Sequence, residues 1–379
     1  MRKDEQDLDM SKIYTAVGLM SGTSLDGVDA AVLKTDGVEI HGFGPTAFRP
    51  FTDEEKQVLH EATQAALVWN FTGPPPNIFA SAETIIHKAH IEVVRQLGVD
   101  NVDLIGFHGQ TILHRPPEGG KNGQTLQLGE GHALAGVLGI DVAYDFRSAD
   151  MAVGGQGAPL APIYHEALLR RSKTDLPAAV LNIGGVSNIT ILTADGILLA
   201  SDCGPGNGPL DSWIKQCGLG DYDKDGVLSM RGTPDFALIE KWLQADFFKK
   251  PPPASADRWD FDVLDDLRAV RPEDGATSLA VFTAISIKKC ITYYGQAIEK
   301  IIVCGGGRHN PAILLALHEQ NIGHIVTAEQ AGWNGDDLEA QAFAYLAVRS
   351  AKALPLSYPK TTGAKTPMSG GKIVKTLKN

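Results

Sequence analysis

Residues 14–33 read YTAVGLMSGTSLDGVDAAVL. Residues 14–20 and 28–33 are mostly apolar and predict two strands. The glycine-containing residues 21–27 between them predict a tight turn, so the stretch as a whole predicts a hairpin near the start of the chain.

The turn of this hairpin offers groups that suit phosphate. Its backbone N–H groups and the Thr23 and Ser24 hydroxyls could hold phosphate oxygens, and a purely structural hairpin accounts for the same residues equally well. The turn has the glycine spacing of a P-loop, but Val28 and Asp29 stand where that motif needs Lys followed by Ser or Thr. A strand also follows where a P-loop needs a helix, so a Walker-type site is excluded.

A similar pattern returns about 165 residues later, which is nearly half of the chain. Residues 178–183 are apolar except for Asn182, Gly184 and Gly185 open a turn, and residues 189–192 are mostly apolar again. Two unrelated hairpins are the alternative to a duplication. Strands that alternate with helices predict an α/β protein, and a hairpin at the start of each half predicts two similar domains that face a cleft.

Apolar periodicity and capping residues predict the remaining elements. The predicted helices are 52–68, 82–97, 130–138, 163–171, 209–217, 234–245, 277–300, 311–320 and 337–351. The other predicted strands are 102–107, 124–128, 141–146, 196–201 and 300–304. Residues 355–379 are rich in Lys, Gly, Thr and Pro and predict a tail laid over the surface.

Charge and cysteine content exclude several classes of protein. Lys and Arg number 34 and Asp and Glu number 45, so the net charge of −11 argues against a nucleic-acid-binding face or a polybasic membrane surface. Four scattered cysteines without a CxxC pair indicate reduced thiols. Residues 1–10 lack the order of a signal peptide, and no apolar run approaches the roughly 18 residues of a membrane helix. We expect a cytoplasmic protein with no nucleic-acid and no membrane partner.

Four polar residues follow predicted strands. His108 and Gln110 follow one strand, and Arg147 and Asp202 each follow another. Asp202 stands just before a Gly-Pro-Gly turn, where a rigidly held carboxylate suits a general base, and capping of that turn is the alternative. Arg147 could clamp a carboxylate or pair with Asp150. His108 and His114 lack the spacing of metal ligands.

Glycines also follow the predicted strand 300–304. Gly305, Gly306 and Gly307 let a nucleotide base and ribose lie against backbone, and a plain tight turn is the alternative. A dinucleotide fingerprint is incomplete here because Asn310 takes the place of its third glycine.

Residues 221–226 match the start of a calcium loop. Gly232 stands at the twelfth position of that loop, where a bidentate carboxylate is required. We therefore expect no calcium site in this segment.

Seven short motifs occur in order along nearly the whole chain. They are MSGTSLDGVD (20–29), HGQT (108–111), DFR (145–147), GGQGAPL (154–160), NIGG (182–185), DCGPGN (202–207) and LEA (338–340). Together they resemble the anhydro-N-acetylmuramic acid kinase family, within the superfamily of actin, hexokinase and the heat-shock chaperones. The resemblance implies an α/β fold of two actin-like (ribonuclease H-like) domains flanking an interdomain nucleotide cleft. It implies a first domain of residues 11–147 plus about 340–379 and a second of residues 148–339.

The resemblance also implies an activity. A kinase of this family uses ATP and Mg²⁺ to open the 1,6-anhydro ring of 1,6-anhydro-N-acetylmuramic acid and to phosphorylate O6, which gives N-acetylmuramic acid 6-phosphate and ADP in peptidoglycan recycling. Asp202 is implied as the catalytic base that takes a proton from the water attacking C1, after which O6 attacks the γ-phosphate.

The same resemblance implies the binding residues. Those for the nucleotide are Gly22, Thr23, Ser24, Leu25, Asp26, Gly27, Val28, Asp29, Gly184, Gly185, Gly305, Gly306 and Gly307. Those for the sugar are His108, Gln110, Arg147 and Glu339, with Arg147 as the partner of the lactyl carboxylate.

The chain departs from the family pattern at two positions. Cys203 stands where threonine is frequent, and the acidic residue usual before Gly22 is absent. The protein ligands of Mg²⁺ are therefore unassigned, and Asp26 or Asp29 could act through water. Two other functions stay open: a kinase for another anhydro sugar such as levoglucosan, and a nucleotide-gated binding module. A homodimer is also left open.

Overall fold

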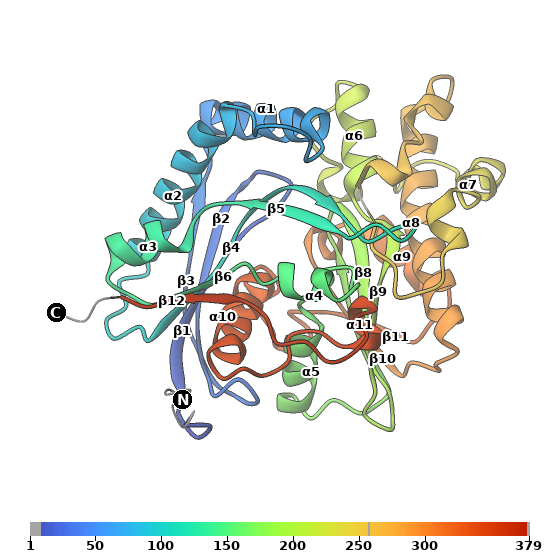
Figure 1. Cartoon of the computed structure of the whole chain (residues 1–379). Coiled ribbons are helices and arrows are strands. Elements are labelled where there is room, and N and C mark those ends of the chain that lie inside the picture. The colour runs from blue at the N-terminus through green and yellow to red at the C-terminus, as the bar shows by residue number, and fades with distance from the viewer. Residues whose placement is uncertain (1–8, 257, 377–379) are drawn as a thin grey trace. The chain divides into compact units, whose positions relative to one another are not determined.

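The computed structural model describes residues 9–256 and 258–376, which form two compact units (Figure 1). The first comprises the described residues of Met1–Ser172, Asp337–Pro359 and Gly363–Asn379, and the second comprises those of Lys173–Asp336 and Lys360–Thr362. The domain bounds implied by the resemblance stay a prediction. The compact units differ from them at residues 148–172 and 337–339, which belong to the first unit, and at residues 360–362, which belong to the second.

The first unit contains a seven-stranded sheet. Its strands are β1 (Tyr14–Ser21), β2 (Gly27–Thr35), β3 (Ile40–Pro50), β4 (Leu104–Arg115), β5 (Gln124–Leu128), β6 (Val142–Tyr144) and β12 (Lys372–Val374). The order is β12-β6-β4-β1-β2-β3, and β5 pairs with β4. β1, β2 and β3 form an antiparallel meander, whereas β4 is parallel to β1 and β6 is parallel to β4.

The second unit repeats this topology in a five-stranded sheet. Its strands are β7 (Ala178–Ile183), β8 (Val186–Leu192), β9 (Leu198–Pro205), β10 (Lys300–Cys304) and β11 (His324–Thr327). β7, β8 and β9 form the meander, β10 is parallel to β7, and β11 is parallel to β10. Both sheets thus have a meander extended by two strands parallel to its first strand, the ribonuclease H-like arrangement. The predicted α/β class and the internal duplication are confirmed.

Helices flank the strands in both units (Figure 1). In the first unit they are α1 (Asp53–Trp69), α2 (Ile78–Gln96), α3 (Gly131–Leu138), α4 (Ser148–Ala152), α5 (Pro162–Arg171) and α10 (Leu338–Ala351). In the second unit they are α6 (Gly208–Gln216), α7 (Phe236–Trp242), α8 (Pro272–Tyr294) and α9 (Pro311–Glu319), and α11 (Pro359–Thr362) is divided between the units. In the described part of the chain, no helix combines the length and the apolar character needed to cross a membrane.

α5 joins the first unit through contacts with α10. The Tyr164 hydroxyl donates to Gln341 Oε1 at 2.6 Å, and the Tyr164 ring lies 5.7 Å from that of Tyr345. These buried contacts explain why residues 148–172 belong with the first sheet.

Several elements differ from the sequence-based expectation. β3 and β11 were not predicted, and both are edge strands. β4 does not end before His108 but continues to Arg115, and β9 continues through Asp202 to Pro205. The prediction for the tail was also wrong in part, since β12 pairs with β6 and extends the first sheet. The Thr376 N–H, which donates to Asp141 Oδ1 at 2.8 Å, helps to hold this added strand.

The two faces of the first sheet carry different residues because side chains alternate along a strand. On one face, Val17 and Leu19 of β1 are fully buried and pack in one core with Leu59 of α1 and Ile86 of α2. In the second unit, Leu181 of β7 joins a comparable core with residues of α8.

The other face of the first sheet receives α10 at very short range. Gly18 and Gly106 are paired between β1 and β4. A Cβ atom on Gly18 would lie 1.8 Å from Ala340 O, and one on Gly106 would lie 2.1 Å from Phe343 O. Only glycine permits this approach, so the two glycines fix the position of α10 on the sheet.

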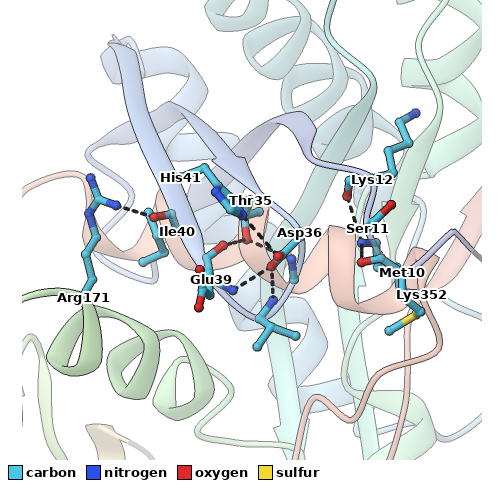
Figure 2. A network of polar contacts seen from close by, with 12 residues as sticks. Met10, Ser11, Lys12, Thr35, Asp36, Glu39, Ile40, His41, Arg171 and Lys352 are labelled. Atoms are coloured by element: carbon cyan, nitrogen blue, oxygen red, sulfur yellow. Dashed lines mark hydrogen bonds and ion pairs between the residues drawn. The ribbon is translucent and has the colours of Figure 1, made fainter.

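The C-terminal end of α10 is fastened to the start of the described chain (Figure 2). The Lys352 ammonium donates to Met10 O at 2.8 Å and to Lys12 O at 2.9 Å. Figure 2 also shows Arg171 donating to Ile40 O at the start of β3. Lys352 at the end of α10 and Arg171 at the end of α5 therefore tie their helices to backbone carbonyls elsewhere in the first unit.

Candidate active site

The turn between β1 and β2 presents the expected phosphate-binding groups to solvent. Thr23, Ser24 and Asp26 are exposed. The turn closes with a bond from Leu25 N–H to Gly22 O at 3.2 Å, and Leu25 itself has a φ of +60°. A Cβ atom on Gly22 would meet only Ser24 Oγ, at 3.6 Å, so the space beside this glycine is open. The turn therefore has room for an anion beside its backbone.

The side chain of Gln110 holds this turn in place through hydrogen bonds. Its Oε1 accepts the Ser21 hydroxyl, and its Nε2 donates to Gly22 O at 3.2 Å. Gln110 is completely buried. Its described side-chain hydrogen bonds are those to the hairpin and one from Nε2 to Thr111 O at 3.4 Å, and its role in binding the sugar stays a prediction.

A bulge in β4 brings Gln110 to this place. Leu19 pairs with Phe107, whereas Ser21 pairs with Gln110, so β4 has one residue more than β1 here. Gly109 has a φ of +74°, which favours glycine. A bulge of this kind re-aims the neighbouring side chains, which explains why His108 and Gln110 are functional candidates although they lie within a strand.

His108 and Arg147 contact each other in the first unit. Arg147 Nη2 donates to His108 Nε2 at 2.9 Å, and Arg147 Nη1 donates to Gly157 O at 2.7 Å. Because Nε2 accepts, the proton of the neutral imidazole must lie on Nδ1. Burial and the Arg147 charge hold the pKa of His108 well below its usual value, so the ring is neutral.

Glu339 lies exposed in the first turn of α10. Phe343 follows four residues later, hence on the same side of the helix, and its ring lies 4.6 Å from that of His108. α10 thus places Glu339 one turn before the residue that packs on His108. Its contact with the sugar stays a prediction.

The loop 154–157 was part of the family resemblance but received no role from the sequence. Gly157 N–H donates to Asp150 Oδ2 at 2.7 Å, and His114 Nε2 lies 2.9 Å from Gln156 O. Together with the bond from Arg147, three polar side chains hold this loop. The sequence indicated a constrained loop only through Gly155. A Cβ atom at this position would lie 2.1 Å from Asp150 Oδ2, so a larger residue does not fit.

The second unit brings its expected glycines together. Asn207 N–H donates to Gly184 O at 2.7 Å, and Gly206 N–H donates to Gly185 O at 3.0 Å. A Cβ atom on Gly305 would lie 2.3 Å from Asn182 Oδ1, at the end of the neighbouring strand. Gly185 and Gly306 are exposed, so backbone is open to a ligand at both turns.

Arg308 supports the second of these turns and was missed by the sequence analysis. Its guanidinium is buried, donates to Gly305 O at 3.0 Å, and forms ion pairs with Glu329 at 2.8 Å and Asp336 at 2.6 Å. A basic residue directly after a glycine run was the only local signal. The turn that exposes Gly306 is therefore rigidly held.

Asp202 lies within β9 and is 9% exposed. Its Oδ2 accepts the Ala256 N–H at 2.8 Å, and its own N–H donates to Ala254 O at 3.0 Å. A buried carboxylate with a fixed hydrogen bond can act as a positioned base.

In the described part of the chain, no group of three or more His, Cys, Asp or Glu residues could hold a metal ion. Mg²⁺ in kinases is bound through one or two carboxylates together with phosphate oxygens and water. The exposed Asp26 beside the hairpin turn fits such partial coordination. Asp223 of the rejected calcium loop instead accepts Leu228 N–H at 2.9 Å and Ser229 N–H at 3.1 Å.

Three buried histidines predict that the free energy of unfolding decreases at acid pH. Burial lowers the pKa of His90, His114 and His165 to about 4, below the unfolded value near 6.5. The unfolded chain then binds more protons between these values, so stability is present above pH 6.5 and is lost as the pH falls toward 4. At pH 5, the titration of each histidine should make the free energy of unfolding roughly 2 kcal/mol lower than it is above pH 6.5.

Urea unfolding at pH 7 and pH 5 measures this effect. His90→Gln is the matched variant, because removal of one titrating ring should make stability depend less on pH. Equal free energies of unfolding at the two pH values would contradict the prediction.

Two ribonuclease H-like units, each with a glycine turn open to solvent, place this chain in the class of actin-like ATPase folds. A family profile described as anhydro-N-acetylmuramic acid kinase matches residues 14–376. The chain belongs to this family.

Two curated relatives agree with the family profile. The anhydro-N-acetylmuramic acid kinases of Caulobacter vibrioides and Mesorhizobium japonicum are 46% and 47% identical over 366 and 367 residues, covering 94% of this chain and 98% of each relative. Among solved structures, component A of (R)-2-hydroxyglutaryl-CoA dehydratase from Acidaminococcus fermentans matches with a TM-score of 0.47 and 14% identity, over 90% of this chain and 99% of that one.

Proposed function

We propose that this protein uses ATP to convert 1,6-anhydro-N-acetylmuramic acid into N-acetylmuramic acid 6-phosphate, with hydrolysis of the 1,6-anhydro bridge. The observation that carries the proposal is the family match across residues 14–376, joined to a buried aspartate on the second sheet. A cytoplasmic location and a role in peptidoglycan recycling belong to the same proposal. A homodimer stays a prediction.

We assign the nucleotide to the glycine turns. The exposed Thr23 and Ser24 and the backbone beside Gly22 would contact the phosphates, while Gly185 and Gly306 would lie against the base and ribose. Asp26 or Asp29 would hold Mg²⁺ through water. When bound, Mg²⁺ neutralises the negative charge that develops on the phosphoryl oxygens.

Asp202 begins the reaction in this proposal. Its carboxylate takes a proton from water, the water oxygen bonds to C1, and the bond between C1 and O6 breaks. O6 then attacks the γ-phosphorus, and ADP leaves. Because the ring opening itself produces the acceptor oxygen, much of the catalysis is positioning.

The experiment that tests this proposal is product identification. The purified protein is incubated with ATP, Mg²⁺ and either 1,6-anhydro-N-acetylmuramic acid or levoglucosan, and products are identified by mass spectrometry. We expect N-acetylmuramic acid 6-phosphate as the main product. Phosphorylation of levoglucosan alone would support the other anhydro-sugar kinase, and no phosphorylated sugar would contradict both.

Arg147→Ala tests the proposed contact with the lactyl carboxylate. A charge-assisted hydrogen bond contributes roughly 1.5–3 kcal/mol, so kcat/KM for 1,6-anhydro-N-acetylmuramic acid should fall about 10–100-fold. Any activity on levoglucosan, which lacks this carboxylate, should fall much less. Arg147→Lys, which retains the charge, is the control, and an equal loss for both sugars would contradict the assignment.

A further inference from the structure

β9 is an edge strand of the second sheet, and Asp202 lies on it. An edge strand exposes backbone N–H and C=O groups that need partners. At Asp202 the partner is a short segment, residues 251–256, which we name the strap. Ala254 O accepts the Asp202 N–H at 3.0 Å, and Ala256 N–H donates to Asp202 Oδ2 at 2.8 Å.

The second of these bonds departs from an ordinary strand ladder. In a ladder, the backbone carbonyl of the edge residue would accept the next N–H of its neighbour. Here the carboxylate of Asp202 accepts that N–H instead. The Asp202 carbonyl accepts the Ser201 hydroxyl at 2.8 Å. The strap therefore contacts the carboxylate itself.

Ser201 fixes the register of the strap. Its side chain is fully buried, and its Oγ accepts the Ala254 N–H at 3.0 Å while it donates to Asp202 O. One hydroxyl thus joins the strap backbone to the backbone of Asp202. A shift of the strap by one residue would break this link and move the Ala256 N–H away from the carboxylate.

Aromatic packing holds both ends of the strap. Phe247 and Phe248 precede it and Phe261 follows it, with ring centroids 5.3 Å apart for Phe247 and Phe261 and 5.9 Å apart for Phe248 and Phe261. Ala254 is buried in the same cluster. Prolines 251–253 fix three φ angles and have no N–H groups, which restricts the strap further.

We propose that the strap is a positioning element for catalysis: the Ala256 N–H orients the Asp202 carboxylate as the base, and Ser201 holds the strap in register. This inference rests on the role of Asp202 under the proposed function. The alternative is that the strap only covers a sheet edge.

Ala256→Pro tests the inference because it removes this N–H and places a ring carbon on the nitrogen that faces the carboxylate. A misplacement of about 1 Å can cost about 10²-fold in rate, so we expect kcat to fall 10–100-fold while the Kd for ATP stays within about twofold. Ala194→Pro is the matched control, since Ala194 is exposed at the second position of the turn between β8 and β9, where proline is favoured. Melting temperatures are measured for both variants.

Ser201→Ala is the second variant, and it tests the positioning role of the strap if Ala256→Pro does not fold. We expect its kcat to fall at least threefold with unchanged ATP affinity. A kcat within twofold of wild type, either in a folded Ala256→Pro protein or in Ser201→Ala, would overturn the inference. So would a parallel loss of ATP affinity and melting temperature in Ser201→Ala, because that pattern indicates a merely structural strap.

Asp202→Asn measured alongside separates this inference from the proposed function. If Asp202→Asn is inactive but the strap variants are fully active, only the role of the strap is wrong. If Asp202→Asn keeps its rate, the role of Asp202 as base is wrong, and the positioning role falls with it.

Discussion

Asp202→Asn is expected to lower kcat by about 10³-fold or more while the Kd for ATP stays within about twofold. The amide matches the carboxylate in shape and can still accept the Ala256 N–H, which the carboxylate binds at 2.8 Å, but it cannot take a proton from water. Turnover is measured by coupled ADP release, and ATP binding by calorimetry.

Asp195→Asn is the matched control for this variant. Asp195 is exposed in the turn between β8 and β9, and its replacement should leave kcat unchanged. Retention of more than about a tenth of the wild-type rate by Asp202→Asn would show that another group acts as the base.

Gly18→Ala is expected to lower the free energy of unfolding by roughly 3–5 kcal/mol. The new methyl group would lie 1.8 Å from Ala340 O and 2.4 Å from Ala344 N, so α10 must move away from the sheet. Because α10 also carries Glu339 and Phe343, the protein that remains folded should lose activity as well. Urea unfolding measures the change.

Gly42→Ala is the control for Gly18→Ala. A Cβ atom on Gly42, which also lies in a strand of the first sheet, would meet nothing within 4 Å. Its effect on stability should stay within about 0.5 kcal/mol. Equal effects of the two substitutions would contradict the claim that close approach of α10 requires glycine at position 18.

Local sequence pattern was sufficient for the elements that define the fold. The hairpin of β1 and β2 and its counterpart in β7 and β8 have apolar runs on both sides of a glycine turn, and both were predicted. β3 was missed because Gly42, Gly44 and Pro45 are rare in strands. Residues 40–50 form a strand because they pair with β2, and their own sequence does not indicate this pairing.

The residues of the candidate site could be predicted from the sequence, but the contacts between them could not. Asp202, His108 and Gln110 were selected because they follow the ends of the predicted strands, although the strands of the structure continue past them. Gln110 pairs with Ser21, 89 residues earlier, only because β4 lies beside β1 with a bulge at Gly109. Nothing in residues 251–256 indicates that they bind Asp202, because that contact depends on the folded edge of the second sheet.

Isotope labelling tests whether one protein both opens the anhydro bridge with water and phosphorylates the released oxygen. The reaction is run with ATP, Mg²⁺ and 1,6-anhydro-N-acetylmuramic acid in water enriched in the heavy oxygen isotope, and the product is analysed at once. Preformed N-acetylmuramic acid in the same water corrects for exchange at C1. We predict N-acetylmuramic acid 6-phosphate with one heavy oxygen at C1 and none in the phosphate group. A product with unlabelled C1, or ADP release without sugar phosphate, would contradict the account.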